Sequence, residues 1–164
     1  MLTLSFATSI LGIIIFLRLI EFMLARANAE RLIAEGAIDL SGDPYLIWMA
    51  LQGGSLFAIA AVIDPDFMPP IWTVLVFAPL PLARGVLIAR WRHQWLHRLL
   101  ITSDGGLINP VPKQYRVTGH MLMAVESAAL PLVLGQPLMG LVIGILHGLL
   151  SVYRLKLEAD HEKN

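Results

Sequence analysis

The chain has 164 residues, of which 57% are hydrophobic and only 15% charged, and its formal net charge is zero. Because a soluble domain of this length has about a quarter of its residues charged, this composition excludes an ordinary soluble domain. The balanced charge gives no basic field for nucleic acid, and the absence of cysteine excludes disulfides, thiolate metal sites and a cysteine nucleophile. We expect a single integral membrane domain over residues 1–164 that binds no nucleic acid.

The first apolar segment, residues 3–24, is long enough to cross the hydrocarbon core of a bilayer, which takes about twenty helical residues. It lacks the positively charged start and the cleavage site of a signal peptide, so we interpret it as a retained span. A charged helix should continue to near Gly36, and the run Ser41-Gly42-Asp43-Pro44 predicts a turn after it.

Four further apolar segments follow, and Pro79 and Pro81 interrupt the second of them. The last two are short and only three residues apart, which predicts an antiparallel helical hairpin. The sequence therefore predicts an all-α, polytopic membrane protein with five transmembrane helices and a C-terminal helical hairpin. The four later spans are expected at residues 45–63, 71–89, 119–134 and 138–153, with a polar loop at 90–118.

The distribution of basic residues predicts the orientation. Of the twelve Lys and Arg residues, ten lie within 26–31, 90–116 and 154–163, whereas the loops 64–70 and 135–137 have none. Cytoplasmic loops carry an excess of Lys and Arg. We therefore expect a protein of a bacterial inner membrane, with its N-terminus outside and with its long polar loop and C-terminus in the cytoplasm.

Ionisable residues within apolar segments are candidates for function, because a charge in lipid faces a cavity or a partner. Arg18 and Glu21 are three residues apart and share one helix face. They form either a simple ion pair near the headgroups or part of a site. Glu126 lies deep in an apolar segment and needs a partner unless it is neutral, and Arg84 is a candidate.

Two further pairs of ionisable residues are candidates for chemistry. Arg154 and Glu158 are four residues apart, so they either pair across a bound ligand or form a solvated surface pair. His120 and Glu126 are six apart and point in different directions on one helix, so they form no dyad by themselves.

The other histidines are interpreted structurally. His93 and His97 have the spacing of metal ligands on a helix, but Arg90 and Arg92 beside them oppose a cation, so we expect interfacial residues and no metal site. His147 lies among glycines in the last span, where we expect a packed, hydrogen-bonded side chain.

Several short motifs occur in an order that is typical of one family. Together they resemble the bacterial isoprenylcysteine carboxyl methyltransferase-like membrane proteins, over nearly the whole chain. The motifs are Arg18-x-x-Glu21 with Asn28, Gly36-Ala37-x-Asp39 before Pro44-Tyr45, Trp95-x-x-Arg98, Glu126-(x)4-Pro131-Leu132 and Arg154-x-x-x-Glu158.

The most specific motif of that family, G-P-Y-R-x-x-R-H-P-x-Y, helps to hold S-adenosylmethionine and is altered here to NPVPKQYRVTGH at residues 109–120. Two registers are possible. Counting back from Glu126 aligns His120 with the final Tyr of the motif. Aligning Tyr115-Arg116 with its Tyr-Arg instead brings His120 onto its His. Neither register restores the motif, as expected of a diverged or lapsed enzyme.

The resemblance implies an S-adenosylmethionine-dependent O-methyltransferase that acts on a membrane-embedded, lipophilic acceptor, either a prenylcysteine carboxylate or a phenolic or polyketide lipid. The alternative is a catalytically lapsed membrane scaffold that binds a lipid or a protein partner. Membrane lipids are expected partners in both cases. The implied residues are Arg154 and Glu158 for catalysis, Tyr115, Arg116, His120 and Glu126 for the cofactor, and Arg18, Glu21, Asn28, Trp95 and Arg98 for the substrate.

Overall fold

Helices make up most of the structure, a computed structural model that describes residues 5–40, 43–108 and 111–161. These residues form six helices and one antiparallel sheet of order β1-β2-β3. The helices are α1 (Phe6–Ala34), α2 (Tyr45–Val62), α3 (Ile71–Phe77), α4 (Pro79–Arg90), α5 (Lys113–Val133) and α6 (Pro137–His161). The strands are β1 (Ile38–Asp39), β2 (Leu100–Ile101) and β3 (Leu107–Ile108). The predicted all-α class is confirmed, and the short sheet was not expected.

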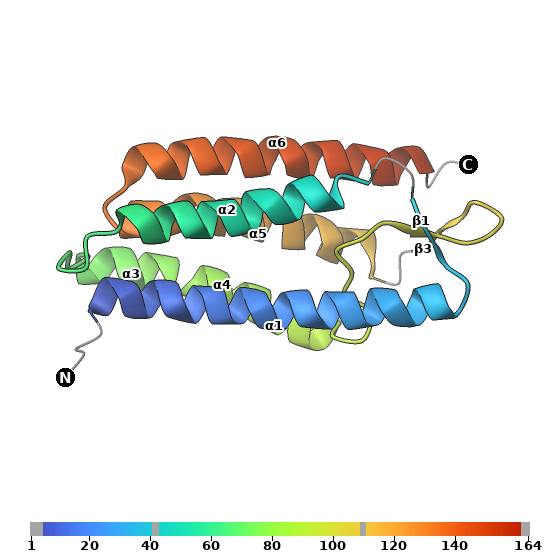
Figure 1. Ribbon diagram of the computed structural model, residues 1–164, viewed down its shortest axis with the longest axis horizontal. Coiled ribbons are helices and arrows are strands. Elements are labelled where there is room, and N and C mark those ends of the chain that lie inside the picture. The colour runs from blue at the N-terminus through green and yellow to red at the C-terminus, as the bar shows by residue number, and fades with distance from the viewer. Residues whose placement is uncertain (1–4, 41–42, 109–110, 162–164) are drawn as a thin grey trace.

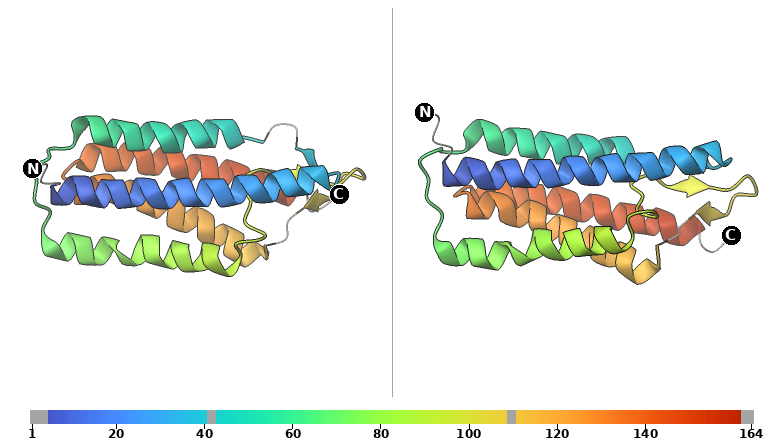
Figure 2. Two further views of the ribbon diagram at one scale, coloured as in Figure 1. Left: turned by 60° about the horizontal axis from the view of Figure 1, so that its bottom comes forward. Right: turned by 90° about the horizontal axis from the view of Figure 1, so that it is seen from below.

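The helices run lengthwise as a bundle (Figure 1), and two further views show the same arrangement (Figure 2). α3 and α4 form one rod, because the chain passes through Ala78 from one into the other. Pro79 and Pro81 lack the N–H groups that would complete the helical hydrogen bonds there, as predicted. The small sheet lies at the end opposite the N-terminus, and we refer to this end as the sheet end.

Four rods among the described residues are long and apolar enough to cross a membrane: α1, α2, the α3–α4 rod and α6. This is the build of an integral membrane protein. Large apolar side chains point outward, and Leu46, Phe57 and Leu138 are each at least 77% exposed. Such a surface is expected where lipid, and not water, surrounds the helices.

The prediction of five apolar spans is wrong by one. The segment expected at 119–134 belongs to α5, which begins earlier, at Lys113, and carries Arg116, His120 and Glu126 along its length. Within the described residues it is not among the helices that qualify as membrane spans. The polar loop is correspondingly shorter than the predicted 90–118, because α4 continues to Arg90 and α5 starts six residues before the expected span.

Two helices end at a glycine in the left-handed region, which glycine adopts without steric cost. Gly36 follows α1 with φ +101°, and Gly135 follows α5 with φ +78°. After α5, the N–H of Gln136 bonds to the carbonyl of Pro131 at 2.8 Å, as in a Schellman motif. The predicted helix end near Gly36 and the predicted turn at 135–137 are therefore confirmed.

α5 and α6 pack closely as the predicted hairpin. A Cβ atom on Gly140 would lie 2.6 Å from the Ala128 carbonyl oxygen, and one on Gly144 would lie 2.7 Å from the Ala128 Cβ. Only glycine leaves room for this approach, which is a small-xxx-small contact of the kind that membrane helices use.

The apolar core lies towards the end opposite the sheet, where the first half of α1 meets the ends of α2, α3 and α5. Among the described residues, the buried charged side chains are Glu21, Arg84, Glu126, Arg154 and Glu158. The core residues are Ala7, Leu11, Ile14, Ile59, Phe77, Leu130, Val133, Leu134 and Ile143.

Candidate functional site

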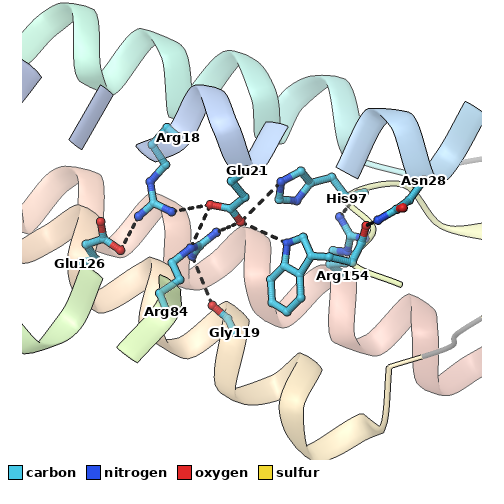
Figure 3. Close-up of polar contacts among 9 residues, drawn as sticks. Arg18, Glu21, Asn28, Arg84, His97, Gly119, Glu126 and Arg154 are labelled. Carbon is cyan, nitrogen blue, oxygen red and sulfur yellow. Dashed lines mark hydrogen bonds and ion pairs between the residues drawn. The ribbon is translucent and has the colours of Figure 1, made fainter. Parts of the chain in front are cut away.

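Glu21 is the centre of a buried polar network (Figure 3). Its carboxylate accepts hydrogen bonds from Arg18 of the same helix at 2.7 Å and from Arg84 Nε of α4 at 3.1 Å. The indole Nε1 of Trp95 donates to it at 3.2 Å. Because Glu21 is only 3% exposed, these donors stabilise a charge that would otherwise be costly to bury.

Glu126 of α5 joins the same network through an ion pair with Arg18 (Figure 3). Arg84, the candidate partner named from the sequence, instead pairs with Glu21 and donates to the Gly119 carbonyl at 3.4 Å. The two guanidinium groups and the two carboxylates balance in charge. α1, α4 and α5 are thus connected through buried ion pairs.

The loop after α4 is held against α1 and α6 by its backbone. Asn28 donates from Nδ2 to the carbonyls of Arg92 at 2.7 Å and of Trp95 at 2.9 Å. Arg154 donates to the carbonyl of His97. The Asn28 amide therefore fixes the path of the loop, whereas the family resemblance implied a role for it in binding substrate.

His97 was not among the predicted site residues, yet it is buried at the centre of the sheet end. Its Nε2 lies 3.5 Å from the Glu21 carboxylate, and its ring packs on Trp48 with centroids 4.7 Å apart. Burial away from water lowers the pKa of His97 to about 3, so the imidazole is neutral at neutral pH. It adds no positive charge to the network.

A second buried ion group joins α5 to α6. The Glu158 carboxylate accepts from Arg116 Nε at 3.0 Å and lies 3.5 Å from Arg154 Nε. The His120 Nε2 is 3.9 Å from the same carboxylate. Arg154 and Glu158 are each 3% exposed, so the possibility of a solvated surface pair is excluded.

Two predicted residues lie at the margin of the site. Arg98 pairs with Asp39 at 3.0 Å and stands over the ring of Tyr45, partly exposed. Tyr115, which the family resemblance had suggested for cofactor binding, packs on Trp91 with ring centroids 5.5 Å apart. Tyr115 does not line the small cavity at the sheet end.

Residues from several elements enclose a small polar cavity at the sheet end. It includes six of the predicted residues, from the loop, α5 and α6, and Gly119 leaves room there for the Trp95 ring. Its volume of about 40 Å³ takes only a few water molecules, since one water needs roughly 10–15 Å³. The predicted lining residues are Trp95, Arg98, Arg116, His120, Arg154 and Glu158; unpredicted ones include Trp48, Arg84, His97 and Met123.

A larger, apolar crevice of about 470 Å³ lies between α1 and α2. It reaches Arg18 and Glu21 at its inner wall and shares Trp48, His97 and Met123 with the polar cavity. A second crevice, of about 210 Å³, lies between α1 and α4 on another side of the same network. The polar network is thus flanked by two apolar openings between helices.

The remaining histidines differ from expectation in two ways. His147 is fully buried as predicted, but neither ring nitrogen has a hydrogen-bond partner among the described residues. His93 and His97 do not share a helix, because α4 ends at Arg90, and His93 is exposed while His97 is buried. Within the described residues, no group of three or more potential metal-binding side chains comes together.

Comparison of the chain with protein-family models, with curated proteins and with solved structures finds no match. The polar groups around the cavity suit S-adenosylmethionine in kind, because Arg154 can donate to a carboxylate and Glu158 can accept from an amino group or hydroxyls. The volume of the polar cavity is far below the roughly 300–1,000 Å³ of small-molecule sites. Binding of the cofactor therefore requires the walls of this cavity to move apart.

Proposed function

We propose that the protein is an S-adenosylmethionine-dependent O-methyltransferase of a membrane-embedded, lipophilic acceptor, similar to the isoprenylcysteine carboxyl methyltransferase-like family. One observation carries the proposal. The polar cavity and the apolar crevice between α1 and α2 share the wall residues Trp48, His97 and Met123. A polar cofactor in the cavity and a lipid in the crevice would therefore lie on either side of the same three side chains.

In this proposal Arg154, Glu158, Arg116 and His120 hold the cofactor, and the crevice orients the acceptor chain. When bound, S-adenosylmethionine would supply a methyl group already activated on sulfur, with a thioether as the leaving group. A carboxylate acceptor would have no proton to lose, whereas a hydroxyl acceptor would lose its proton to solvent. The protein then contributes mainly alignment and exclusion of water. Besides its own contact with the cofactor, Glu158 would position Arg154, because the two side chains are in direct contact.

We further propose a bacterial inner-membrane location in which the sheet end faces the cytoplasm. The N-terminus and the 63–70 connection lie at the opposite end of the bundle (Figure 1). Ten of the twelve Lys and Arg residues lie in segments 26–31, 90–116 and 154–163, which supports this orientation under the positive-inside rule.

Calorimetric titration of S-adenosylmethionine and S-adenosylhomocysteine into the purified protein tests the function. We expect binding by the native chain and at least about tenfold weaker binding by Glu158→Gln, because a buried charge-assisted contact is removed. Glu30→Gln is the matched control: it alters a pair of the same spacing, Arg26–Glu30, that is exposed. An absence of binding at millimolar ligand by the native chain would refute the methyltransferase.

The second candidate, a non-catalytic scaffold that binds a lipid, is favoured by the small volume of the polar cavity. The charged residues that line this cavity make ion pairs with one another, as Arg116 and Arg154 do with Glu158. A scaffold would retain lipid in the α1–α2 crevice and give no heat with either cofactor form. Lipid extraction and mass spectrometry of the same purified sample distinguish it from a protein that binds neither.

A further inference from the structure

The crevice between α1 and α2 has the size of a ligand site and walls suited to an alkyl chain. Its volume of about 470 Å³ falls within the roughly 300–1,000 Å³ of small-molecule sites. Its lining is almost wholly apolar, with a few polar groups on the inner side. The apolar lining residues include Ile15, Leu19, Phe22, Met49, Leu56 and Phe57.

Two lining residues of α2, Trp48 and Gln52, each carry a polar atom that has no hydrogen-bond partner within the described residues. Trp48 and Gln52 are 97% and 91% buried, from exposures of 3% and 9%. Neither the Trp48 Nε1 donor nor the Gln52 Oε1 acceptor has a hydrogen-bond partner within the described residues. The two residues are four apart on one helix and therefore lie one turn from each other on the same face. A buried donor and a buried acceptor are each costly without a partner, and a hydroxyl is a group that can both accept and donate a hydrogen bond.

The charges beside the crevice are already compensated. Arg18 and Glu21 are the charged residues of its lining, and they pair with each other at 2.7 Å and with Glu126 and Arg84, respectively. His97, which also borders it, is neutral because burial lowers its pKa to about 3. An anionic headgroup would therefore find two carboxylates nearby and two guanidinium groups already paired with them.

We propose that this crevice binds a long-chain phenol, with its hydroxyl between the Trp48 indole N–H and the Gln52 side-chain oxygen. A hydroxyl accepts from the indole and donates to the amide oxygen at once, whereas an ionised carboxylate has no proton to donate to Gln52. The preference for a phenol over an aliphatic alcohol rests on the proposed function, because a phenol, with a pKa near 10, gives up its proton far more readily on O-methylation. The crevice and its two polar atoms do not depend on that function.

Photo-crosslinking in phosphatidylcholine nanodiscs tests the proposal, with an alkylphenol that carries a diazirine in its chain. At a pH of about 8.5 a phenol is neutral and a carboxylic acid is ionised. We expect labelled peptides from α1 and α2, and competition by meta-pentadecylphenol at about tenfold lower concentration than by hexadecanoate. Gln52→Leu should reduce that difference to about threefold or less.

Two adjacent glycines provide matched blocking variants. Gly53 borders the α1–α2 crevice, and Gly54 borders a different apolar crevice between α2 and α6. No atom lies within 4 Å of a Cβ added at either position. Gly53→Leu should abolish labelling of α1 and α2, and Gly54→Leu should leave it unchanged. Because both changes add the same side chain to the same helix, a difference between them reports the crevice that is filled.

Three results would overturn the proposal: equal competition by hexadecanoate, labelling that persists in Gly53→Leu, or equally strong labelling by a phosphatidylcholine with the same diazirine chain. If Gly53→Leu fails to fold, the Gln52→Leu competition still decides. The assay contains no S-adenosylmethionine. A protein that binds the phenol but not the cofactor retains this inference and refutes the methyltransferase, and the converse result does the opposite.

Discussion

Arg154 donates a hydrogen bond to the backbone carbonyl of His97, and so the last helix holds the loop that carries the buried imidazole. Asn28 holds the same loop from α1, through the carbonyls of Arg92 and Trp95. The loop lacks regular structure over residues 91–99, yet its backbone position is set by two helices. This explains how a polar connection can form one wall of a site inside a bundle of apolar helices.

Removal of Arg84 should be severe. The guanidinium is 2% exposed and is one of the partners of Glu21. Arg84→Leu therefore removes a positive charge that stabilises this buried carboxylate. We expect a loss of about 3–5 kcal/mol, measured by thermal or denaturant unfolding in detergent. Arg26→Leu, at an exposed ion pair with Glu30, should unfold at nearly the native temperature. Equal effects of the two changes would contradict the central role of the network.

The ion pair between Arg18 and Glu126 should show strong coupling. Arg18→Met alone and Glu126→Leu alone each leave a buried charge with fewer partners. The double variant removes one positive and one negative charge, so it should be more stable than the sum of the two single losses predicts, by about 1–3 kcal/mol. A double-mutant cycle measured by unfolding checks this. Additive losses would mean that the two side chains do not depend on each other.

Stability should fall on mild acidification because of His97. Burial lowers the pKa of this histidine to about 3 in the folded protein, against about 6.5 when it is exposed in the unfolded chain. Below about pH 6.5 the unfolded chain therefore takes up a proton that the folded chain does not, and the loss continues down to about pH 3. Unfolding measured between pH 7 and 5 should show a smaller slope in His97→Gln. His93→Gln, at an exposed position, should keep the native slope.

The contact between α5 and α6 should not tolerate even one methyl group. A Cβ at Gly140 would lie 2.6 Å from the Ala128 carbonyl oxygen, which is backbone and cannot move aside cheaply. Gly140→Ala should therefore cost about 1–3 kcal/mol in thermal unfolding. Gly148→Ala, in the same helix with no atom within 4 Å of the added Cβ, should be neutral or slightly stabilising. Similar behaviour of both variants would refute the close packing.

The proposed orientation can be tested with single cysteines, because the chain has none of its own. Ser103 lies exposed in the turn between β2 and β3, and Asp66 lies exposed between α2 and α3 at the other end. In intact cells, a thiol reagent that does not cross the inner membrane should label Asp66→Cys and spare Ser103→Cys. The reverse pattern would invert the topology.

Much of the fold could be predicted from local patterns, and tertiary partners could not. Three-residue spacing predicted that Arg18 and Glu21 are neighbours, and the need for a partner at Glu126 was also correct. The identity of that partner depends on which helix faces meet, and one sequence does not contain that information. Arg84 and Arg18 were equally plausible by charge, and the structure pairs Glu126 with Arg18.

The residues that were missed lie in apolar surroundings or in the loop. Trp48 and Gln52 belong to α2, which is apolar enough to span a membrane, so the composition of this segment did not single out their polar atoms. A signal did exist: on α2 the buried residues Trp48, Gln52, Ser55 and Ile59 follow a helical spacing, and three of them carry polar atoms. His97 had no such signal, because its burial depends on how the loop folds back between α1 and α6.

The close fit of α6 against Ala128 has a consequence for how the protein is made. α5 carries charged residues from Lys113 to Glu126 and is not apolar enough to be favoured in a bilayer as a solitary helix. Its partner α6 follows after a three-residue turn, and Gly140 and Gly144 let the two backbones meet directly. During synthesis the two helices should therefore leave the translocon together, and a nascent chain that is released before α6 emerges should be recognised by quality-control proteases.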